Sequence, residues 1–245
     1  MKKIYTLIFI NLLIPAWLWN HELFLLINGF NSPIANHIIG FTTGFADGLV
    51  ATVLIGILML FKLRLGLAAL LAGIFSGIFI QILKRIFDMP RPPTVFGDVH
   101  LLGERLSFHS FPSGHATTAG ALAILSLLLW EKKPALAWLG FALSIFMAYG
   151  RIYGGVHFPL DVVIGFGIGA LSMYWCNKWS KRWQMKAWAT QPWAWRLSSL
   201  FLFVTAIALA SSHSIQPDTA QPLTQLVPAL ALMAWLYAWQ QQRKT

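Results

Sequence analysis

The stretch of sequence that decides the fold is Leu65–Phe87, which reads LGLAALLAGIFSGIFIQILKRIF. It carries no charged residue before Lys84, and about 20 residues of this kind let a helix cross the hydrocarbon core of a bilayer. Lys84 and Arg85 then stand at the end of a membrane-length segment, where ionisable groups are costly and tend to serve a function. The stretch therefore predicts a transmembrane helix with a functional charge at one end.

The rest of the chain has the same apolar character. Of its 245 residues, 57 % are hydrophobic and 11 % are charged, whereas a soluble domain carries about 25 % charged residues. The mean hydropathy is +0.65, and the 12 Trp and 18 Phe recur within the apolar runs. We therefore expect an all-α fold, a polytopic membrane helix bundle.

Apolar runs predict eight spans. The first is short and follows Lys2 and Lys3, which is also typical of a signal peptide, but no small-x-small cleavage site follows, so we expect a retained helix. Asn20–Phe45 is apolar but interrupted by Asn, His and Gly, and two interpretations stay open: short helices at the membrane surface, or a connecting loop. The predicted spans are Ile4–Trp19, Gly48–Phe61, Leu65–Phe87, His115–Trp130, Pro134–Tyr149, Leu160–Asn177, Arg196–Ser211 and Leu223–Trp239.

The positions of the basic residues predict the orientation, because Lys and Arg concentrate in cytoplasmic loops. With both termini inside, 13 of the 18 Lys and Arg residues fall on the inner side, and all seven histidines fall outside. The net charge of +10 is then a signal of topology, and a nucleic-acid partner is not expected. The five basic residues left outside are Lys84, Arg85, Arg91, Arg105 and Arg151.

Three outer segments carry residues suited to phosphate. In the first, Lys84-x6-Arg91, a helix is expected to end near Pro90, because the residue before a proline disfavours the α region. The ammonium of Lys84 and the guanidinium of Arg91 can then approach one anion from two directions. Taken alone, the pair could also be two basic side chains that extend to lipid headgroups.

The second segment, Pro112-Ser113-Gly114-His115, lies where a loop enters an apolar helix. Ser113 is a candidate N-cap, and Gly114 lets a ligand approach the backbone closely. The free amides and the positive dipole end of such a helix terminus bind anions, and His115 stands at this opening. A structural interpretation also exists, in which Ser113 only caps the helix and His115 is interfacial.

The third segment runs from Arg151, which adds a third cation, to Asp161. One helix is expected to end at the glycine pair within it, and the next to begin after Pro159. His157 and Asp161 are four residues apart and would share one face of a helix or tight turn. The Asp161 carboxylate could then accept the Nδ1 proton of His157 and leave Nε2 free to attack.

The loop Thr94–Phe111 between the first two segments is polar. It is either a lid over a polar headgroup or an ordinary solvated loop, and the sequence leaves both open. Its ionisable residues are Asp98, His100, Glu104, Arg105 and His109.

Together the three segments resemble the signatures of the type 2 phosphatidic acid phosphatase (PAP2) superfamily, K-x6-R-P, P-S-G-H and S-R-x5-H-x3-D. The chain matches all three, except that Gly150 stands where the third has a leading Ser, which removes a hydroxyl expected near the phosphate. The resemblance covers the first six spans. It implies a six-helix PAP2-like catalytic membrane domain at 1–182, with 183–245 as a C-terminal extension of two transmembrane helices.

The resemblance also implies residue roles. His157 would be the nucleophile that forms a phosphohistidine, Asp161 would orient it, and His115 would protonate the leaving oxygen. This chemistry needs a neutral His157 and a charged His115. No metal and no cofactor are implied. The residues implied to hold the phosphate oxygens are Lys84, Arg91, Ser113, Gly114 and Arg151.

The function favoured by these features is that of a lipid phosphatase at the outer, periplasmic face of a bacterial inner membrane. Undecaprenyl pyrophosphate or phosphatidylglycerol phosphate would be the substrate, and surrounding membrane lipids the other partners. One alternative is a phosphotransferase that moves phosphate from undecaprenyl pyrophosphate to lipid A. The other is a lipid-binding or transport protein without catalysis, although the pair of histidines with Asp161 exceeds what binding requires. The sequence leaves the oligomeric state open.

Overall fold

The computed structural model describes residues 11, 13–182, 188, 191–212 and 215–243, and its regular elements within these ranges are all helices. This confirms the all-α prediction. Up to the middle of the chain these are α2 (Asn20–Gly29), α3 (Pro33–Thr43), the 3-10 turn η1 (Gly44–Ala46), α4 (Gly48–Phe61), α5 (Leu63–Phe87) and α6 (Pro92–Phe96). The later elements are α7 (Gly114–Leu129), α8 (Pro134–Tyr153), α9 (Pro159–Ser180), α11 (Pro192–Ala210), the turn η2 (Asp218–Ala220) and α12 (Leu223–Gln242).

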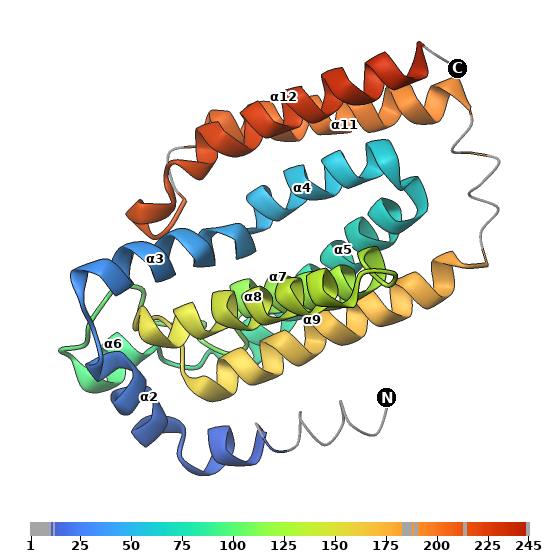
Figure 1. Cartoon of the computed structure of the whole chain (residues 1–245). Coiled ribbons are helices and arrows are strands. Elements are labelled where there is room, and N and C mark those ends of the chain that lie inside the picture. Colours follow the sequence, from blue (N-terminus) through green and yellow to red (C-terminus); the bar gives the residue numbers. More distant parts are fainter. Residues whose placement is uncertain (1–10, 12, 183–187, 189–190, 213–214, 244–245) are drawn as a thin grey trace.

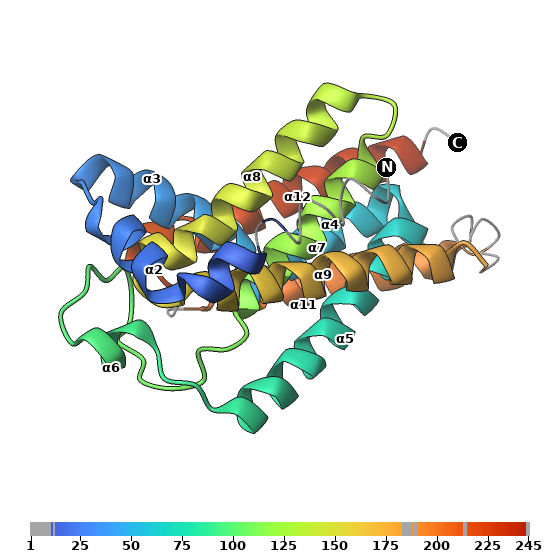
Figure 2. The ribbon, with the colours of Figure 1, turned by 90° about the horizontal axis from the view of Figure 1, so that it is seen from below.

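Helix α7 lies at the centre of the bundle, packed against α8 and α9 and also touching α5 (Figures 1 and 2). Glycines on α9 bring it unusually close to α7: a Cβ added at Gly169 would lie 1.8 Å from the Thr117 carbonyl oxygen, and one at Gly165 2.4 Å from that of Ser113. Small residues allow such close approach of helices where no aqueous driving force acts between them. This contact places the first turns of α7 and α9 side by side.

The three motif segments lie at one end of the bundle. Helices α5 and α8 end there, α7 and α9 begin there, and α6 with its flanking loops covers the same end (Figures 1 and 2). The tight connections from α4 to α5 and from α7 to α8 lie at the opposite end. Those connections carry Lys62, Lys132 and Lys133, and Arg64 lies in the first turn of α5 beside them. The antiparallel arrangement thus separates the motif segments from the basic turns.

The C-terminal helices α11 and α12 pack together along the outer side of α4 (Figure 1). Their buried contact includes Val50 and Val53 of α4, Leu202 of α11 and Val227 of α12. Gly56 of α4 allows close approach here, since an added Cβ would lie 3.0 Å from Leu202 Cδ1. Helix α4 is therefore held between the central bundle and the C-terminal pair.

Within the described residues, fewer helices qualify as membrane spans than the eight expected for the whole chain. Five helical segments within the described residues are long and apolar enough to cross a membrane, and α3–η1 with α4 would add a sixth, bent by 59°. Half of the predicted span Ile4–Trp19 lies outside the described residues. Helix α4 has 14 residues and α7 has 16, so α7 alone is only about 24 Å long. The predicted spans Gly48–Phe61 and His115–Trp130 therefore agree with α4 and α7 in length and, to within one residue, in position, although neither helix alone has the length of a full span.

The region Asn20–Phe45 forms short helices, as the first of its two interpretations expected, while their position at the membrane surface stays a prediction. Ser32 caps α3, because its side chain accepts a hydrogen bond from the Ala35 amide at 3.2 Å. Phe24 and Asn28 of α2 are buried, and Asn28 donates to the carbonyl oxygen of Tyr153 at the end of α8. These short helices therefore brace the end of the bundle where the motif segments meet.

Candidate active site

The first motif segment is a helix end followed by an extended strap. Helix α5 ends at Phe87, and Asp88 follows in a left-handed conformation with φ 38°, which turns the chain away from the helix axis. Lys84 remains in the last turn, and Arg91 caps the short helix α6. The predicted placement of the two cations, one before and one after the helix end, is confirmed.

Both cations bind carbonyl oxygens of neighbouring segments. Lys84 Nζ donates to the His109 carbonyl oxygen, and Arg91 Nε donates to that of Phe108 at 3.0 Å. Arg91 Nη1 donates to the Val156 carbonyl oxygen at 3.1 Å. Arg91 thereby ties the loop before α7 to the turn before α9.

The second segment forms the start of α7 as predicted. Ser113 is the N-cap, and its Oγ accepts a hydrogen bond from the Ala116 amide at 3.4 Å. The Ser113 amide donates to the Asp161 carbonyl oxygen at 3.0 Å. An added Cβ at Gly114 would meet no atom within 4 Å. The α7 terminus is thus fixed against α9 and leaves open space beside its first residue.

The third segment is a compact turn between α8 and α9. Helix α8 runs to Tyr153, so Arg151 belongs to its last turn and is buried. The His157 amide donates to the Arg151 carbonyl oxygen at 3.2 Å. Asp161, in the first turn of α9, accepts the Phe158 amide at 2.9 Å. Its carboxylate therefore fixes the turn as well as facing His157.

The contact between His157 and Asp161 differs from the expected direct hydrogen bond. Nδ1 of His157 and Oδ2 of Asp161 are 3.5 Å apart, longer than a normal hydrogen bond. The buried hydroxyl of Ser110 adjoins both groups: it donates to Asp161 Oδ2 at 2.5 Å and lies 3.4 Å from His157 Nδ1. The carboxylate is thus linked to the imidazole partly through a serine that the sequence analysis missed.

The other ring nitrogen of His157 faces a guanidinium. Arg91 Nη1 lies 3.4 Å from Nε2. A guanidinium can only donate hydrogen bonds, so the nitrogen facing it is the one with a lone pair. The proton then resides on Nδ1, toward Ser110 and Asp161. This is the tautomer that a nucleophilic Nε2 requires.

Burial and charge keep this imidazole neutral. His157 is 3 % exposed, and burial, followed by the charges of Arg91, Arg151 and Lys84, holds its pKa well below the ordinary value of 6.5. At neutral pH the side chain is therefore an uncharged base in a positively charged surrounding.

All six ionisable motif residues come together. The charges of Arg151, Arg91 and Lys84 act on both His115 and His157, so the two imidazoles lie in one electrostatic environment. Asp161 acts on Lys84 and Arg91. In the described structure, His115 Nε2 and Arg151 Nε are buried without a hydrogen-bond partner. Buried polar atoms are normally paired, and an oxyanion between them would pair both.

Gly150, the departure from the family signature, faces away from this cluster. An added Cβ would lie 3.0 Å from Ile39 Cγ2 and 3.1 Å from Thr43 Cβ, both on α3. A serine at this position would therefore pack against α3. The expected loss of a hydroxyl at the phosphate does not follow from this geometry.

The loop Thr94–Phe111 combines a solvated part with a fixed part. Arg105 donates to the Gly97 carbonyl oxygen at 2.6 Å, and Asp88 pairs with His109 at 3.3 Å while both side chains remain half exposed. Near its end the loop supplies the carbonyl oxygens for Lys84 and Arg91 and then Ser110. It thus completes the cluster, a role that its polar composition did not reveal.

Three cations, two imidazoles and one carboxylate thus gather at one end of the helix bundle of an integral membrane protein, and this is a set of groups suited to a phosphate. Among the described residues, no three His, Cys, Asp or Glu side chains gather as a metal site. Comparison of the chain with known protein families identifies the family to which it belongs. The chain belongs to the PAP2 superfamily, whose family model matches residues 61–185.

Individual relatives agree with this assignment. The chain is 28 % identical to the undecaprenyl-diphosphatase of Sulfolobus acidocaldarius over 155 residues, which cover 62 % of this chain and 74 % of that protein. It is 40 % identical to the lipid A 1-phosphatase of Rhizobium johnstonii over 65 residues, 26 % of this chain and 25 % of that protein. The latter match is confined to a short part of both chains.

Two solved structures share the fold. The crystal structure of Aquifex aeolicus LpxE has a TM-score of 0.59 and 32 % identity, covering 67 % of this chain and 95 % of that one. The phosphatidylglycerolphosphate phosphatase of Bacillus subtilis has a TM-score of 0.56 and 23 % identity, covering 72 % and 94 %. At that identity the second comparison concerns the fold alone.

Proposed function

We propose that this chain is a membrane lipid phosphatase that hydrolyses a lipid phosphate or diphosphate through a phosphohistidine. The observation that carries the proposal is the buried, neutral His157, whose Nε2 faces Arg91 while Nδ1 faces Ser110 and Asp161. Membership of the PAP2 superfamily and similarity to an undecaprenyl-diphosphatase support it. Undecaprenyl pyrophosphate is the first substrate to test, and phosphatidylglycerol phosphate the second.

In the proposed reaction, Nε2 of His157 attacks phosphorus and the bond to the leaving oxygen breaks. His115 gives a proton to that oxygen, and water then hydrolyses the phosphohistidine. Lys84, Arg91 and Arg151 neutralise charge on the equatorial oxygens, and the α7 terminus at Ser113 and Gly114 adds amide donors. These groups supply the stabilisation from the chain itself, so the reaction needs no metal.

The decisive experiment measures phosphate release from a panel of lipid phosphates in detergent. His157→Ala is expected to lower the rate about a thousandfold, because the covalent route is lost. His37→Ala is the matched control, since His37 is an exposed histidine on α3 outside the cluster, and it should retain the wild-type rate. Full activity of His157→Ala would contradict the mechanism.

Metal dependence and the fate of the phosphate are tested in the same assay. We expect a chelator to leave the rate unchanged, and loss of activity that added divalent cations restore would contradict metal independence. With labelled undecaprenyl pyrophosphate and lipid A together, we expect the label in free phosphate. Label on lipid A would identify a phosphotransferase instead, and binding without turnover a lipid-binding protein.

We propose that the site faces the periplasm of a bacterial inner membrane, because it lies opposite the basic turns of the bundle. Cys176, the sole cysteine, is buried and can be replaced by Ser. In that background, Glu104→Cys in the site loop should react with a membrane-impermeant maleimide in spheroplasts. Lys132→Cys at the opposite end should stay unlabelled, and the reverse pattern would overturn the orientation.

A further inference from the structure

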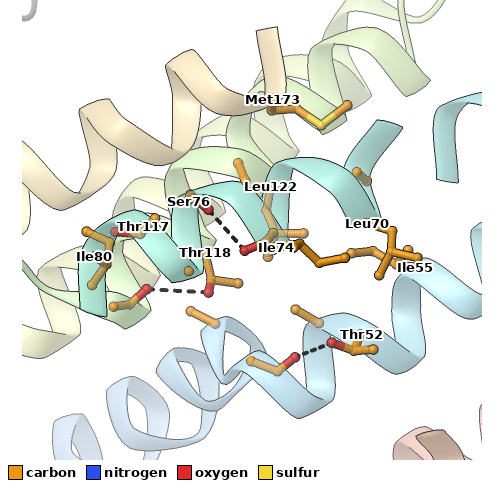
Figure 3. A pocket seen from close by; sticks show the side chains of 18 of the residues that line it. Thr52, Ile55, Leu70, Ile74, Ser76, Ile80, Thr117, Thr118, Leu122 and Met173 are labelled. Atoms are coloured by element: carbon orange, nitrogen blue, oxygen red, sulfur yellow. Dashed lines mark hydrogen bonds between the residues drawn. The ribbon is translucent and has the colours of Figure 1, made fainter. Parts of the chain in front are cut away.

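A groove of about 450 Å³ lies between α4, α5 and α7 (Figure 3). This volume is within the range of small-molecule binding pockets. Its α5 wall follows one helical face, at Gly73, Ser76, Gly77, Ile80 and Gln81. The α4 wall includes Thr52 and Ile55, and the α7 wall Thr118 and Leu122.

The hydroxyls on the walls are already paired within their own helices. Thr52 Oγ1 donates to the Gly48 carbonyl oxygen at 2.7 Å, Ser76 Oγ to that of Ala72 at 2.7 Å, and Thr118 Oγ1 to that of Gly114 at 3.4 Å. The dashed lines of Figure 3 follow these bonds along the helices. The walls thus present mainly carbon to the groove, which suits a hydrocarbon chain better than a polar ligand.

Two glycines of α5 keep the groove open. A glycine inside a helix is less favourable than an alanine, and in the α7–α9 contact the close approach of the two helices explains the glycines. Gly73 and Gly77 have no such neighbour, since a Cβ added at either would meet no atom within 4 Å. Because these two glycines have no side chain, the groove beside them stays open, and larger residues at these positions would fill it.

The groove reaches the active site at the start of α7. His115 and Gly114 are among its lining residues, whereas His157 is not. In an in-line transfer, the leaving oxygen lies opposite the attacking nitrogen. A chain in the groove would therefore be attached to the oxygen beside His115. At the flank, Ile74 lines the groove and is 46 % exposed, so the groove opens on the lipid-facing side of α5.

We propose that the groove between α4, α5 and α7 holds the hydrocarbon chain of the leaving group, and that Gly73 and Gly77 determine which chains are accepted. The inference rests on the proposed lipid phosphatase function. It assigns an orientation: the phosphoryl group lies between His157 and the three cations, and the chain leaves on the side of His115.

The test compares Gly73→Leu and Gly77→Leu with wild type on a long polyprenyl diphosphate and on geranyl diphosphate. The ratio of kcat/KM for the long chain to that for the short chain should fall at least tenfold in both variants. Gly29→Leu is the matched control, because an added Cβ there also meets no atom within 4 Å while Gly29 lies outside the groove. It should keep the wild-type ratio.

Chemical protection gives a readout independent of turnover. In nanodiscs of phosphatidylcholine, with Cys176 replaced by Ser, Gly77→Cys should be shielded from a small maleimide by a long-chain lipid phosphate. Inorganic phosphate should not shield it. The reference is the labelling rate in the phosphatidylcholine nanodisc without added lipid phosphate. If the long-chain lipid phosphate leaves this rate unchanged, the groove does not hold its chain and the proposal is overturned.

The outcomes separate the two proposals. If the wild type releases no phosphate from any lipid of the panel, the proposed function fails. If the wild type is active but both leucine variants keep its chain-length ratio, only the groove assignment fails.

Discussion

At the scale of single residues, the site depends on how His157 is held. Its two ring nitrogens have different surroundings: a donor-only guanidinium at Nε2, and the Ser110 hydroxyl and Asp161 carboxylate at Nδ1. Asp161 also accepts the Phe158 amide, so one carboxylate fixes both the turn and the imidazole. The proposed chemistry therefore rests on hydrogen bonds that connect three separate segments of the chain.

Ser110 is expected to act as a positioning residue. Ser110→Ala removes a hydroxyl that donates to Asp161 at 2.5 Å, and hydrogen bonds to charged groups contribute about 1.5–3 kcal/mol. We expect kcat to fall about tenfold or more with little change in KM. Ser107→Ala, at an exposed serine of the same loop, should leave both constants unchanged. A rise in KM without loss of kcat would contradict the positioning role.

The lowered pKa of His157 is expected to determine where phosphatase activity declines on the acidic limb of its pH profile. Since the folded-state pKa lies below 6.5 in the ligand-free protein, Nε2 keeps its lone pair as the pH falls through 6.5, and kcat/KM should decline only at lower pH. Arg91→Gln removes one of the cations responsible, so it should move this limb toward higher pH while lowering the rate. A limb above pH 6.5 in the wild type would contradict the assignment.

The lowered pKa of His157 also makes folding stability depend on pH. Below pH 6.5 the unfolded chain binds a proton at His157 that the folded chain does not bind, so folding stability should decrease as the pH falls through this value.

At the scale of elements, the contact between α7 and α9 positions the site. Gly165 and Gly169 bring the α9 backbone against carbonyl oxygens of α7, and the Ser113 amide binds the Asp161 carbonyl oxygen. His115 on α7 and Asp161 on α9 therefore share one rigid unit. The strap from α5 and the end of α8 then add the three cations.

Gly169→Ala tests this contact. The new methyl group would lie 1.8 Å from the Thr117 carbonyl oxygen, so the helices must separate. Such overpacking costs typically about 1–3 kcal/mol, and we expect a lower midpoint of thermal unfolding in detergent together with reduced phosphate release. Gly73→Ala, whose added Cβ meets no atom, should keep the wild-type midpoint. Equal midpoints for the two variants would argue against the contact.

At the scale of the whole molecule, the C-terminal helices support the fold away from the cluster. α11 and α12 pack along α4, which in turn forms one wall of the groove. We propose that 183–245 is an extension added to a catalytic domain at 1–182. The solved LpxE structure, matched over 95 % of its length by 67 % of this chain, is consistent with such a division.

Leu202→Ala tests the role of this extension. Leu202 is fully buried against α4, and a leucine-to-alanine change in a core costs about 2–5 kcal/mol. We expect a lower unfolding midpoint but an unchanged kcat at temperatures where the variant is folded, because α11 lies outside the cluster. Leu200→Ala, at an exposed leucine of the same helix, is the control. Loss of kcat in folded Leu202→Ala would show that the extension acts on the site.

The sequence by itself determined the helical membrane class, the cations at the ends of apolar runs and the motif pairs, because these depend on local composition and spacing. The tertiary structure alone decided that Ser110 adjoins His157 and Asp161, and that Gly150 faces α3. It also decided that Gly73 and Gly77 border a groove while Gly165 and Gly169 lie in a close helix contact. The reason is physical: local sequence sets which helix forms, but a side chain acquires its neighbours only when distant helices pack.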